Sequence, residues 1–517
     1  MNSFPWLSLL TFVPFIGAVL LLGLEETQKR TARVILVLVS LLDLGVGGLL
    51  WSRFQTGSAE LQFVERHSWI PSLGVDYFVG IDGLGLIALL LTVIVFPIAL
   101  AASTGLEKNS SRYFALLLFL ESGLIGTFTA LNFFHWFLYW ELSVVPAYFL
   151  IRLWGGPSRV SAAWEFFIFT MVGSIAMLLG FLAMHYATGT FDFIRLAELS
   201  RSGELKSALS VRLAWYGLSE NSLSLVIFIA VFLGIAVKIP LVPFHTWLPN
   251  TYAEAPTATT VVLTGVMSKM GVYALVRVLL PIFPDQLREL MTPLLWIAVA
   301  TIVFPAFAAF AQTDIKRLFA YSSVNHLGFC FLGVLAAAQL TPANAISASA
   351  STFALNGVVL QLFNHGLTAA LLFCFVAFLE RRTGGVRAIN QFGGLRKIVP
   401  AFYALMGVSV FASLGLPGLN GFISEFLIFK GSLANITWAA VISTLGLLAT
   451  AIFLLTLLQK IFAGPVNERW SKMPDLTLTE RLVVVPGTAV ALALGIFPDL
   501  LLGLANGTVI QIVEGLK

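Results

Sequence analysis

Long apolar runs, separated by short polar stretches, recur along the whole chain. Fourteen of these runs hold about 20 residues, which is enough for an α-helix to cross a hydrocarbon core of about 30 Å. The pattern therefore predicts an all-α integral membrane protein with about 14 transmembrane helices. The first run lacks a small-residue cleavage site and many runs follow it, so we expect it to be retained. The predicted spans lie near residues 6–24, 32–52, 84–104, 112–131, 133–153, 162–187, 221–239, 257–280, 292–313, 318–339, 350–380, 400–427, 435–463 and 482–504.

Two of the apolar runs are interrupted. The stretch GIAVKIPLVPFHTWLPN (234–250) carries Pro240 and Pro243, and each proline removes a backbone donor and clashes with the preceding turn. The stretch FASLGLPGLNGFISEF (411–426) has Pro417 and Gly418 in its middle. Interrupted spans at matching positions of two halves indicate an inverted-repeat transporter. We therefore expect two discontinuous helices.

The spacing of the interruptions predicts two repeats. Spans four to eight (112–280) form one unit and spans nine to thirteen (292–463) form the other, and the interrupted span is the fourth in each. Because each unit has an odd number of spans, the two units insert with opposite orientation. The predicted organisation is N-terminal helices 1–3, a first repeat, a second inverted repeat, and a C-terminal loop with helix 14, at residues 1–111, 112–280, 281–463 and 464–517.

Composition and charge agree with a membrane protein. The chain is 58% hydrophobic and 11% charged, against about 25% charged residues in soluble domains. Loops after odd-numbered spans carry eighteen Lys and Arg residues and the other side carries ten. The positive-inside rule places the odd-numbered loops in the cytoplasm and both termini on the opposite side. The net charge of +4 reflects this asymmetry and does not indicate a nucleic-acid partner.

Several kinds of chemistry are excluded by missing motifs. Cys330 and Cys374 are isolated within apolar runs, and the chain has no CxxC pair, haem motif or iron–sulfur spacing. It also has no GxGxxG after a strand and no Walker loop. We expect no cofactor and no bound metal in this chain, and the two cysteines are interpreted as small core residues.

Ionisable residues within the spans are the candidates for function. A lysine near the bilayer centre costs about 2.5–3.5 kcal/mol on insertion, so such residues usually face a bundle interior and mark ion or proton pathways. Burial lowers the pKa of a lysine and a nearby carboxylate raises it again, so a lysine with a movable acidic partner can hold or release a proton. The candidates for a Glu/Lys/His proton relay are Glu141, Lys238, Lys269, His326, His365 and Glu425, with His245 as a weaker one; Glu121 and Glu165 also lie within spans.

Structural interpretations of some candidates stay open. Glu141 can be a static charge that only neutralises Lys238, and His326 or His365 can be a core histidine. Glu165 lies near the start of its span and is interpreted as interfacial.

Five motifs, taken in order, resemble those of one family. They are AVKIPLVPFHTWLPNTYAEAPT (236–257), SKMGVYALVR (268–277), AQTDIKRLFAYSSVNHLGF (311–329), LFNHGLTAALLF (362–373) and LPGLNGFISEF (416–426). They are similar to those of the antiporter-like membrane subunit of complex I-type enzymes, known as NuoM in bacteria and as NdhD, chain 4 of the NAD(P)H-quinone oxidoreductase, in cyanobacteria and chloroplasts. The resemblance covers nearly the whole chain.

The resemblance implies a non-redox subunit of an NAD(P)H- or ferredoxin-dependent quinone oxidoreductase, which translocates protons while other subunits transfer electrons. Its partners would be other membrane subunits, including further antiporter-like ones, and lipids. By motif match Glu141 and Lys238 would be a coupling ion pair and Lys269 the central relay. His326 and His365 would continue the path to Glu425, the terminal acid.

Other stretches favour a particular branch of the family. The opening MNSFPWL and the stretch LQFVERHSWIPSLGVDYFVGIDGLG (61–85) resemble the cyanobacterial branch, which implies plastoquinone, photosynthesis and a thylakoid membrane with both termini in the lumen. Where the family has a lysine before FFxYT this chain has Glu165, and where it reads HTWLPDAHxEAPT this chain has Asn250 and Tyr252. These departures favour the form of the complex devoted to CO2 uptake, with a carbonic-anhydrase-like partner.

Two other functions remain open. An Mrp-type Na+/H+ antiporter subunit shares the motifs, although the N-terminal stretch favours the quinone oxidoreductase. A scaffold whose buried charges have lost their role would pump normally without Lys238 and Lys269.

Overall fold

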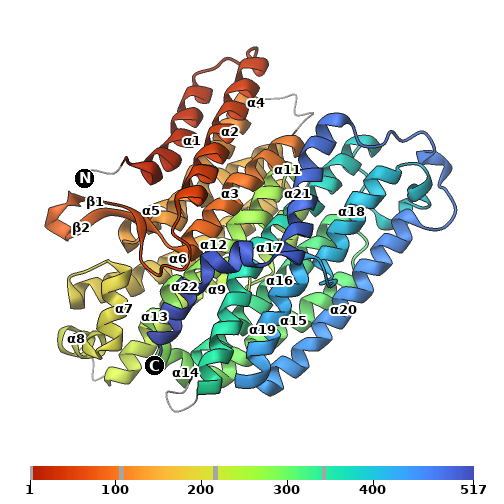
Figure 1. Ribbon diagram of the computed structural model, residues 1–517. Helices are drawn as coiled ribbons and strands as arrows, with labels where there is room; N and C mark the ends of the chain where they lie inside the picture. Colours follow the sequence, from red (N-terminus) through yellow and green to blue (C-terminus); the bar gives the residue numbers. More distant parts are fainter. Residues whose placement is uncertain (1–3, 104–109, 214–218, 341–344) are drawn as a thin grey trace.

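The computed structural model describes residues 4–103, 110–213, 219–340 and 345–517. The first three residues of the stretch MNSFPWL and the last residue of the run 84–104 lie outside the described residues. The molecule is a bundle of long helices, most of which run in one common direction (Figure 1). The prediction of a helical multi-pass membrane protein is confirmed.

Ten helical stretches in the described part of the chain are long and apolar enough to cross a membrane. They coincide with ten of the fourteen predicted spans. These stretches are α2 (Lys29–Arg53), α3 (Gly83–Ala102), α6 (Arg159–Thr188), α9 (Glu220–Lys238), α11 to α13 (Thr257–Ile282), α15 (Met291–Phe310), α16 (Ile315–Ala338), α17 (Ala345–Thr383), α20 (Thr437–Phe462) and α21 (Leu478–Ile496).

The other four predicted spans also coincide with helices, but the count of fourteen crossings stays a prediction. These helices are α1 (Trp6–Leu22), α4 (Ser110–Thr129), α5 (Phe133–Trp154), and the pair α18 (Pro400–Ser413) and α19 (Asn420–Asn435). One boundary was wrong: the run 482–504 is divided, because α21 ends at Ile496 and α22 (Asp499–Glu514) follows Pro498. α22 packs against α3 and α17.

The burial of each helix locates the centre of the bundle. The most apolar window of α17 is completely buried, whereas only a third of the corresponding window is buried in α2 and in α21. The stretch α11 to α13 and α16 are nearly as buried as α17. Helices at the periphery expose apolar side chains, as a lipid-facing surface requires, and the central three can hold polar groups away from lipid.

The structure confirms both predicted helix breaks. α9 ends at Lys238, and the short α10 (Trp247–Glu254) begins after Pro240 and Pro243. The second break separates α18 from α19, with Gly415 and Gly418 at positive φ between them. Each broken stretch is the fourth member of its predicted unit; the inverted repeat and the four domain boundaries stay predictions.

A third irregularity was not predicted. The stretch α11 (Thr257–Val262), α12 (Ser268–Ala274) and α13 (Leu280–Ile282) is continuous, but two π-helical turns interrupt it, η2 (Leu263–Met267) and η3 (Leu275–Leu279). Such turns widen a helix locally and occur frequently at functional sites.

A hairpin and three short helices were also not predicted. An antiparallel hairpin, β1 (Gln62–Ile70) and β2 (Val75–Ile81), connects α2 to α3. The Glu65 carboxylate of β1 accepts hydrogen bonds from the backbone of Leu7 (2.8 Å) and Ser8 (3.2 Å), and so fixes the hairpin to the beginning of α1. Three short helices complete the fold: α7 (Phe193–Arg201), α8 (Glu204–Arg212) and α14 (Pro284–Glu289).

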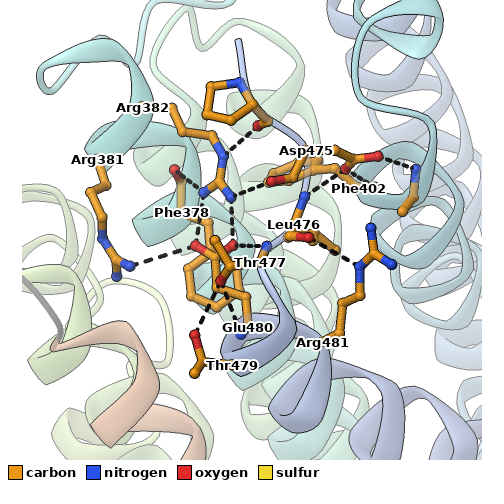
Figure 2. A network of polar contacts seen from close by, with 12 residues as sticks. Phe378, Arg381, Arg382, Phe402, Asp475, Leu476, Thr477, Thr479, Glu480 and Arg481 are labelled. Carbon is orange, nitrogen blue, oxygen red and sulfur yellow. Dashed lines mark hydrogen bonds and ion pairs between the residues drawn. The ribbon is translucent and has the colours of Figure 1, made fainter.

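A buried ion pair fastens the last helices to the central one. Figure 2 shows the Arg382 guanidinium, at the end of α17, facing the Glu480 carboxylate of α21. Its two terminal nitrogens lie 2.8 and 2.5 Å from the two carboxylate oxygens, and both side chains are about 95% buried. Arg382 also donates to the backbone carbonyls of Pro474 and Asp475 (2.9 and 3.1 Å), so one side chain holds the loop that precedes α21.

Candidate functional site

Lys269 lies at the centre of the bundle and its amine has three acceptors. The residue is fully buried on α12, directly after the π-helical turn η2. Its Nζ lies 2.6 Å from the Thr264 carbonyl oxygen, 3.2 Å from Ser268 Oγ and 3.0 Å from His365 Nδ1. An ammonium group has three N–H donors and no acceptor. When His365 is the Nε2–H tautomer its Nδ1 is an acceptor, and the three contacts then satisfy the charged form of Lys269.

The contacts continue from Lys269 through two histidines to an acid. The rings of His365 (α17) and His326 (α16) have centroids 4.9 Å apart. His326 Nδ1 lies 3.1 Å from Glu425 Oε1, although not with hydrogen-bond geometry. All three side chains are at least nine-tenths buried. The structure thus brings together four predicted residues from four helices.

The second helix break positions Glu425. α19 begins at Asn420, and Glu425 follows within two turns. Gly415 in the break has φ +78°, and a Cβ atom there would lie 2.8 Å from Glu425 Oε2. The backbone of the break therefore lies against the carboxylate as only a glycine allows. A cavity of about 10 Å³ adjoins His326, His365, Ser413 and Glu425, which is about the space of one water molecule.

Lys238 lies at the first helix break, where α9 ends. It is 2% exposed, and its Nζ is 4.9 Å from the centroid of the Trp140 ring, a cation–π contact. Glu141, the next residue on α5, is the acid whose charge acts on Lys238. However, no ion pair closer than 4.0 Å joins these two described residues, and neither side chain has a hydrogen-bond partner. The implied coupling pair is thus separated in this structure.

A second cavity of about 10 Å³ adjoins Lys238. The residues that line it include Trp247, Tyr252 and Ser268, the residue before Lys269. α12 packs directly on the end of α9, because a Cβ atom on Gly271 would lie 3.3 Å from the carbonyl carbon of Lys238. We call the set of Glu141, Lys238, Lys269, His365, His326 and Glu425 the relay line.

Two candidates lie outside the relay line. His245 is buried in the first break, but its Nδ1 has no partner and its ring packs against Phe304, a residue on the outer surface. Glu165 accepts a hydrogen bond from Asn250 Nδ2 (2.9 Å), and the Arg317 guanidinium donates to the Asn250 oxygen.

These three residues adjoin an open cavity of about 450 Å³ whose other lining residues include Glu254 and Asp314. Two of the departures from the family pattern, at positions 165 and 250, are therefore in contact with each other.

Sequence reasoning missed several polar residues. Ser268 and the Thr264 carbonyl contact Lys269, and Ser413 Oγ lies 3.4 Å from His326 Nε2. Only the position of Ser268 beside Lys269 could have indicated its role. Asp43 on α2 is fully buried and acts electrostatically on Glu121 of α4. None of the four carboxyl oxygens of this acid pair has a hydrogen-bond partner.

Metal binding has no apparent site in the described residues. No three His, Cys, Asp or Glu side chains there come together as ligands. Both cysteines are buried, and their thiols point to the backbone carbonyls of His326 and Ile98.

Comparisons with known proteins agree with this geometry. Residues 130–452 match the family model described as NADH:quinone oxidoreductase/Mrp antiporter, TM. The chain is 33% identical over 513 residues to NADH-quinone oxidoreductase subunit M of Rhodobacter capsulatus, covering 98% of this chain and 96% of that protein. It is 33% identical over 509 residues to NAD(P)H-quinone oxidoreductase chain 4 1 of Synechococcus elongatus, covering 96% and 90%.

A solved structure is similar over the same length. A chain of respiratory complex I from Thermus thermophilus with bound NADH superposes with a TM-score of 0.83 and 27% identity, and the match covers 99% of this chain and all of that one.

Proposed function

Because this chain belongs to the family of membrane subunits that NADH:quinone oxidoreductases and Mrp antiporters share, we propose that it translocates protons in a complex I-type assembly and that the relay line carries them. Other membrane subunits of that assembly, including further antiporter-like ones, would be its partners. The redox chemistry would take place in those partners, since the sequence offers no site for a redox cofactor.

The observation that carries this proposal is the chain of buried contacts from Lys269 to Glu425. Three consecutive steps, Lys269 to His365, His365 to His326 and His326 to Glu425, lie within direct contact or ring-packing distance. A neutral imidazole accepts a proton at one nitrogen and releases one from the other. Lysine, histidine and carboxylate can thus exchange one proton along the line without moving the backbone.

Glu141 and Lys238 would control the delivery of protons to the rest of the relay line. Their separation in this structure leaves Lys238 without an acid in contact, the state in which a buried amine releases its proton most easily. When the Glu141 carboxylate approaches, the amine holds its proton again. Movement of Glu141 would therefore couple events in a neighbouring subunit to the relay line.

Reconstituted complex tests this proposal through single substitutions. We expect Lys238→Ala, Lys269→Ala and Glu141→Gln each to lower the number of protons translocated per electron at least tenfold, with normal assembly. Lys430→Ala is the matched control, because Lys430 is an exposed lysine on α19 that only stacks on Phe353. Full proton translocation in either buried-lysine variant would reject the proposal and favour a scaffold.

The second function is that of an Mrp-type Na+/H+ antiporter subunit, which the family description includes. It predicts sodium transport opposite to proton transport and no dependence on electron transfer. Measuring both ion fluxes in proteoliposomes separates the two functions.

The finer proposal is a cyanobacterial thylakoid complex that uses plastoquinone and takes up CO2. The N-terminal stretch and the departures at Glu165, Asn250 and Tyr252 support it. Identification of the co-purifying subunits tests it: a carbonic-anhydrase-like partner is expected, and its absence from a complete, active complex would refute the CO2-uptake form.

A further inference from the structure

No hydrogen bond joins the two lysines of the relay line in the described part of the chain, and a small cavity adjoins Lys238 and Ser268, the residue before Lys269. At about 10 Å³ this cavity has room for one water molecule. A buried water needs two to four polar partners. Lys238, Tyr252 and Ser268, which carry an amine and two hydroxyl groups, are among its six lining residues.

Of the polar groups that line the cavity, only Ser268 also touches Lys269. Its Oγ lies 3.2 Å from Lys269 Nζ and donates to the Thr264 carbonyl at 3.1 Å. The Tyr252 hydroxyl donates to the Leu263 carbonyl (3.1 Å). The Trp247 indole donates to the Val237 carbonyl (3.2 Å) and has no lone pair to accept a proton.

The Ser268 hydroxyl can take two orientations, and the charge of Lys269 selects between them. When Lys269 is an ammonium, its three N–H groups are directed to Thr264, Ser268 and His365, so the serine hydrogen must turn elsewhere and meets the Thr264 carbonyl. When Lys269 is neutral it has only two N–H groups and one lone pair. The serine O–H can then donate to that lone pair.

We propose that Ser268 is a further relay residue, which passes protons from the Lys238 cavity to Lys269 by rotation of its hydroxyl. This inference rests on the proposed function. An N–H of the Lys238 ammonium breaks and its proton joins the water oxygen. A water proton then joins Ser268 Oγ, and the former serine proton forms an N–H bond on Lys269. Lys238 ends neutral, Lys269 ends as an ammonium, and the water and the hydroxyl are restored.

The transfer also has a direction. After it, the new serine hydrogen turns to the Thr264 carbonyl while Lys269 is an ammonium, and it can donate to Lys269 again only once Lys269 has passed its own proton to His365. The Ser268 hydroxyl thus admits one proton for each proton that leaves toward Glu425. The Thr264 carbonyl holds the hydroxyl in the waiting orientation, and η2 places this carbonyl beside both side chains.

The test compares four variants in reconstituted complex, with electron transfer and proton translocation measured together. Ser268→Ala removes the hydroxyl and is expected to lower the protons per electron at least tenfold. Ser268→Thr retains the hydroxyl and is expected to keep more than half. Ser409→Ala is the matched control, because Ser409 is equally buried and its hydroxyl donates only to the Leu405 carbonyl. Ser268→Cys keeps the volume and substitutes a weak donor, so we expect an intermediate loss.

The outcomes separate this inference from the proposed function. If Ser268→Ala translocates protons as the parent does while Lys238→Ala does not, the role of Ser268 is refuted and the relay line stands. Equal losses in the alanine and threonine variants would show a packing effect and also refute it. If Ser268→Ala does not assemble, parental translocation by Ser268→Cys refutes it. Normal translocation by both lysine variants would instead reject the proposed function.

Discussion

The substitution Gly415→Ala tests whether the second helix break positions Glu425. Its effect on the position of the carboxylate can be distinguished from its effect on the stability of the protein. Gly415 has φ +78°, where an L-residue costs about 1–2 kcal/mol relative to glycine. The new methyl group would also lie 2.8 Å from Glu425 Oε2. The carboxylate must therefore withdraw by about 0.6 Å to reach an ordinary contact, and its 3.1 Å contact with His326 changes.

Gly418→Ala is a close control for this change. Gly418 lies in the same break with φ +92°, but a Cβ atom there meets nothing within 4 Å. Both variants should therefore lose the same 1–2 kcal/mol of stability. Only Gly415→Ala should lose proton translocation, by about tenfold, since misplacement of a reacting group by about 1 Å can cost up to 100-fold.

The assay measures two quantities on each purified variant complex: the midpoint of thermal release of this subunit, and the protons translocated per electron. The thermal midpoints of Gly415→Ala and Gly418→Ala should fall by the same amount. Only Gly415→Ala should translocate fewer protons per electron. Equal proton ratios in the two variants would refute the argument that the break positions Glu425 for transfer. A much lower midpoint for Gly415→Ala would show instead that the clash is relieved by the backbone rather than by the flexible side chain.

Three further predictions concern other parts of the molecule. Glu480→Gln leaves the buried Arg382 without its counter-charge and should cost about 3–5 kcal/mol, seen as a smaller amount of assembled subunit; an amount equal to the parent would contradict this. Glu121→Gln gives the buried Asp43 carboxylate an amide donor, so it should leave the thermal midpoint unchanged or raise it by the equivalent of about 1 kcal/mol, and a marked drop would show that the acid pair has another partner. His245→Gln should keep proton translocation within about twofold of the parent, because no hydrogen bond, ion pair or ring contact among the described residues joins His245 to the relay line; a tenfold loss would place this histidine on the path.

The helical membrane fold and the two helix breaks could be predicted from the sequence because the apolar core of a membrane allows few kinds of structure. Apolar length predicts spans, and Pro240, Pro243 and Pro417 predict the breaks. The hairpin β1–β2 and the helices α7 and α8 escaped this reasoning because they lie outside the apolar runs, where no such rule applies. Pro498 divides the last apolar run, but apolar stretches lie on both sides of this proline. The pattern of apolar residues alone therefore does not indicate the division.

The candidate site was predicted as a set of residues and not as a set of contacts. Burial of a lysine or an acid in lipid is costly enough that residue type alone points to function. The order Lys269, His365, His326 depends on how α12, α16 and α17 pack, and no spacing in the chain contains that information. Ser268 escaped the sequence reasoning for a further reason: serine is tolerated in any span, and in the sequence only its position beside Lys269 distinguishes it from other serines.

Under the proposed function, the small volume of the two cavities restricts which ion the relay line could carry. An alkali cation must exchange its water shell for several oxygen ligands, and each cavity admits about one water molecule. Between the cavities the groups in contact are an amine and two imidazoles, whose nitrogens bind hydrogen ions and coordinate sodium poorly. The proposed relay would therefore select protons without a filter, because only an ion with no electron shell of its own can pass from atom to atom through a closed core.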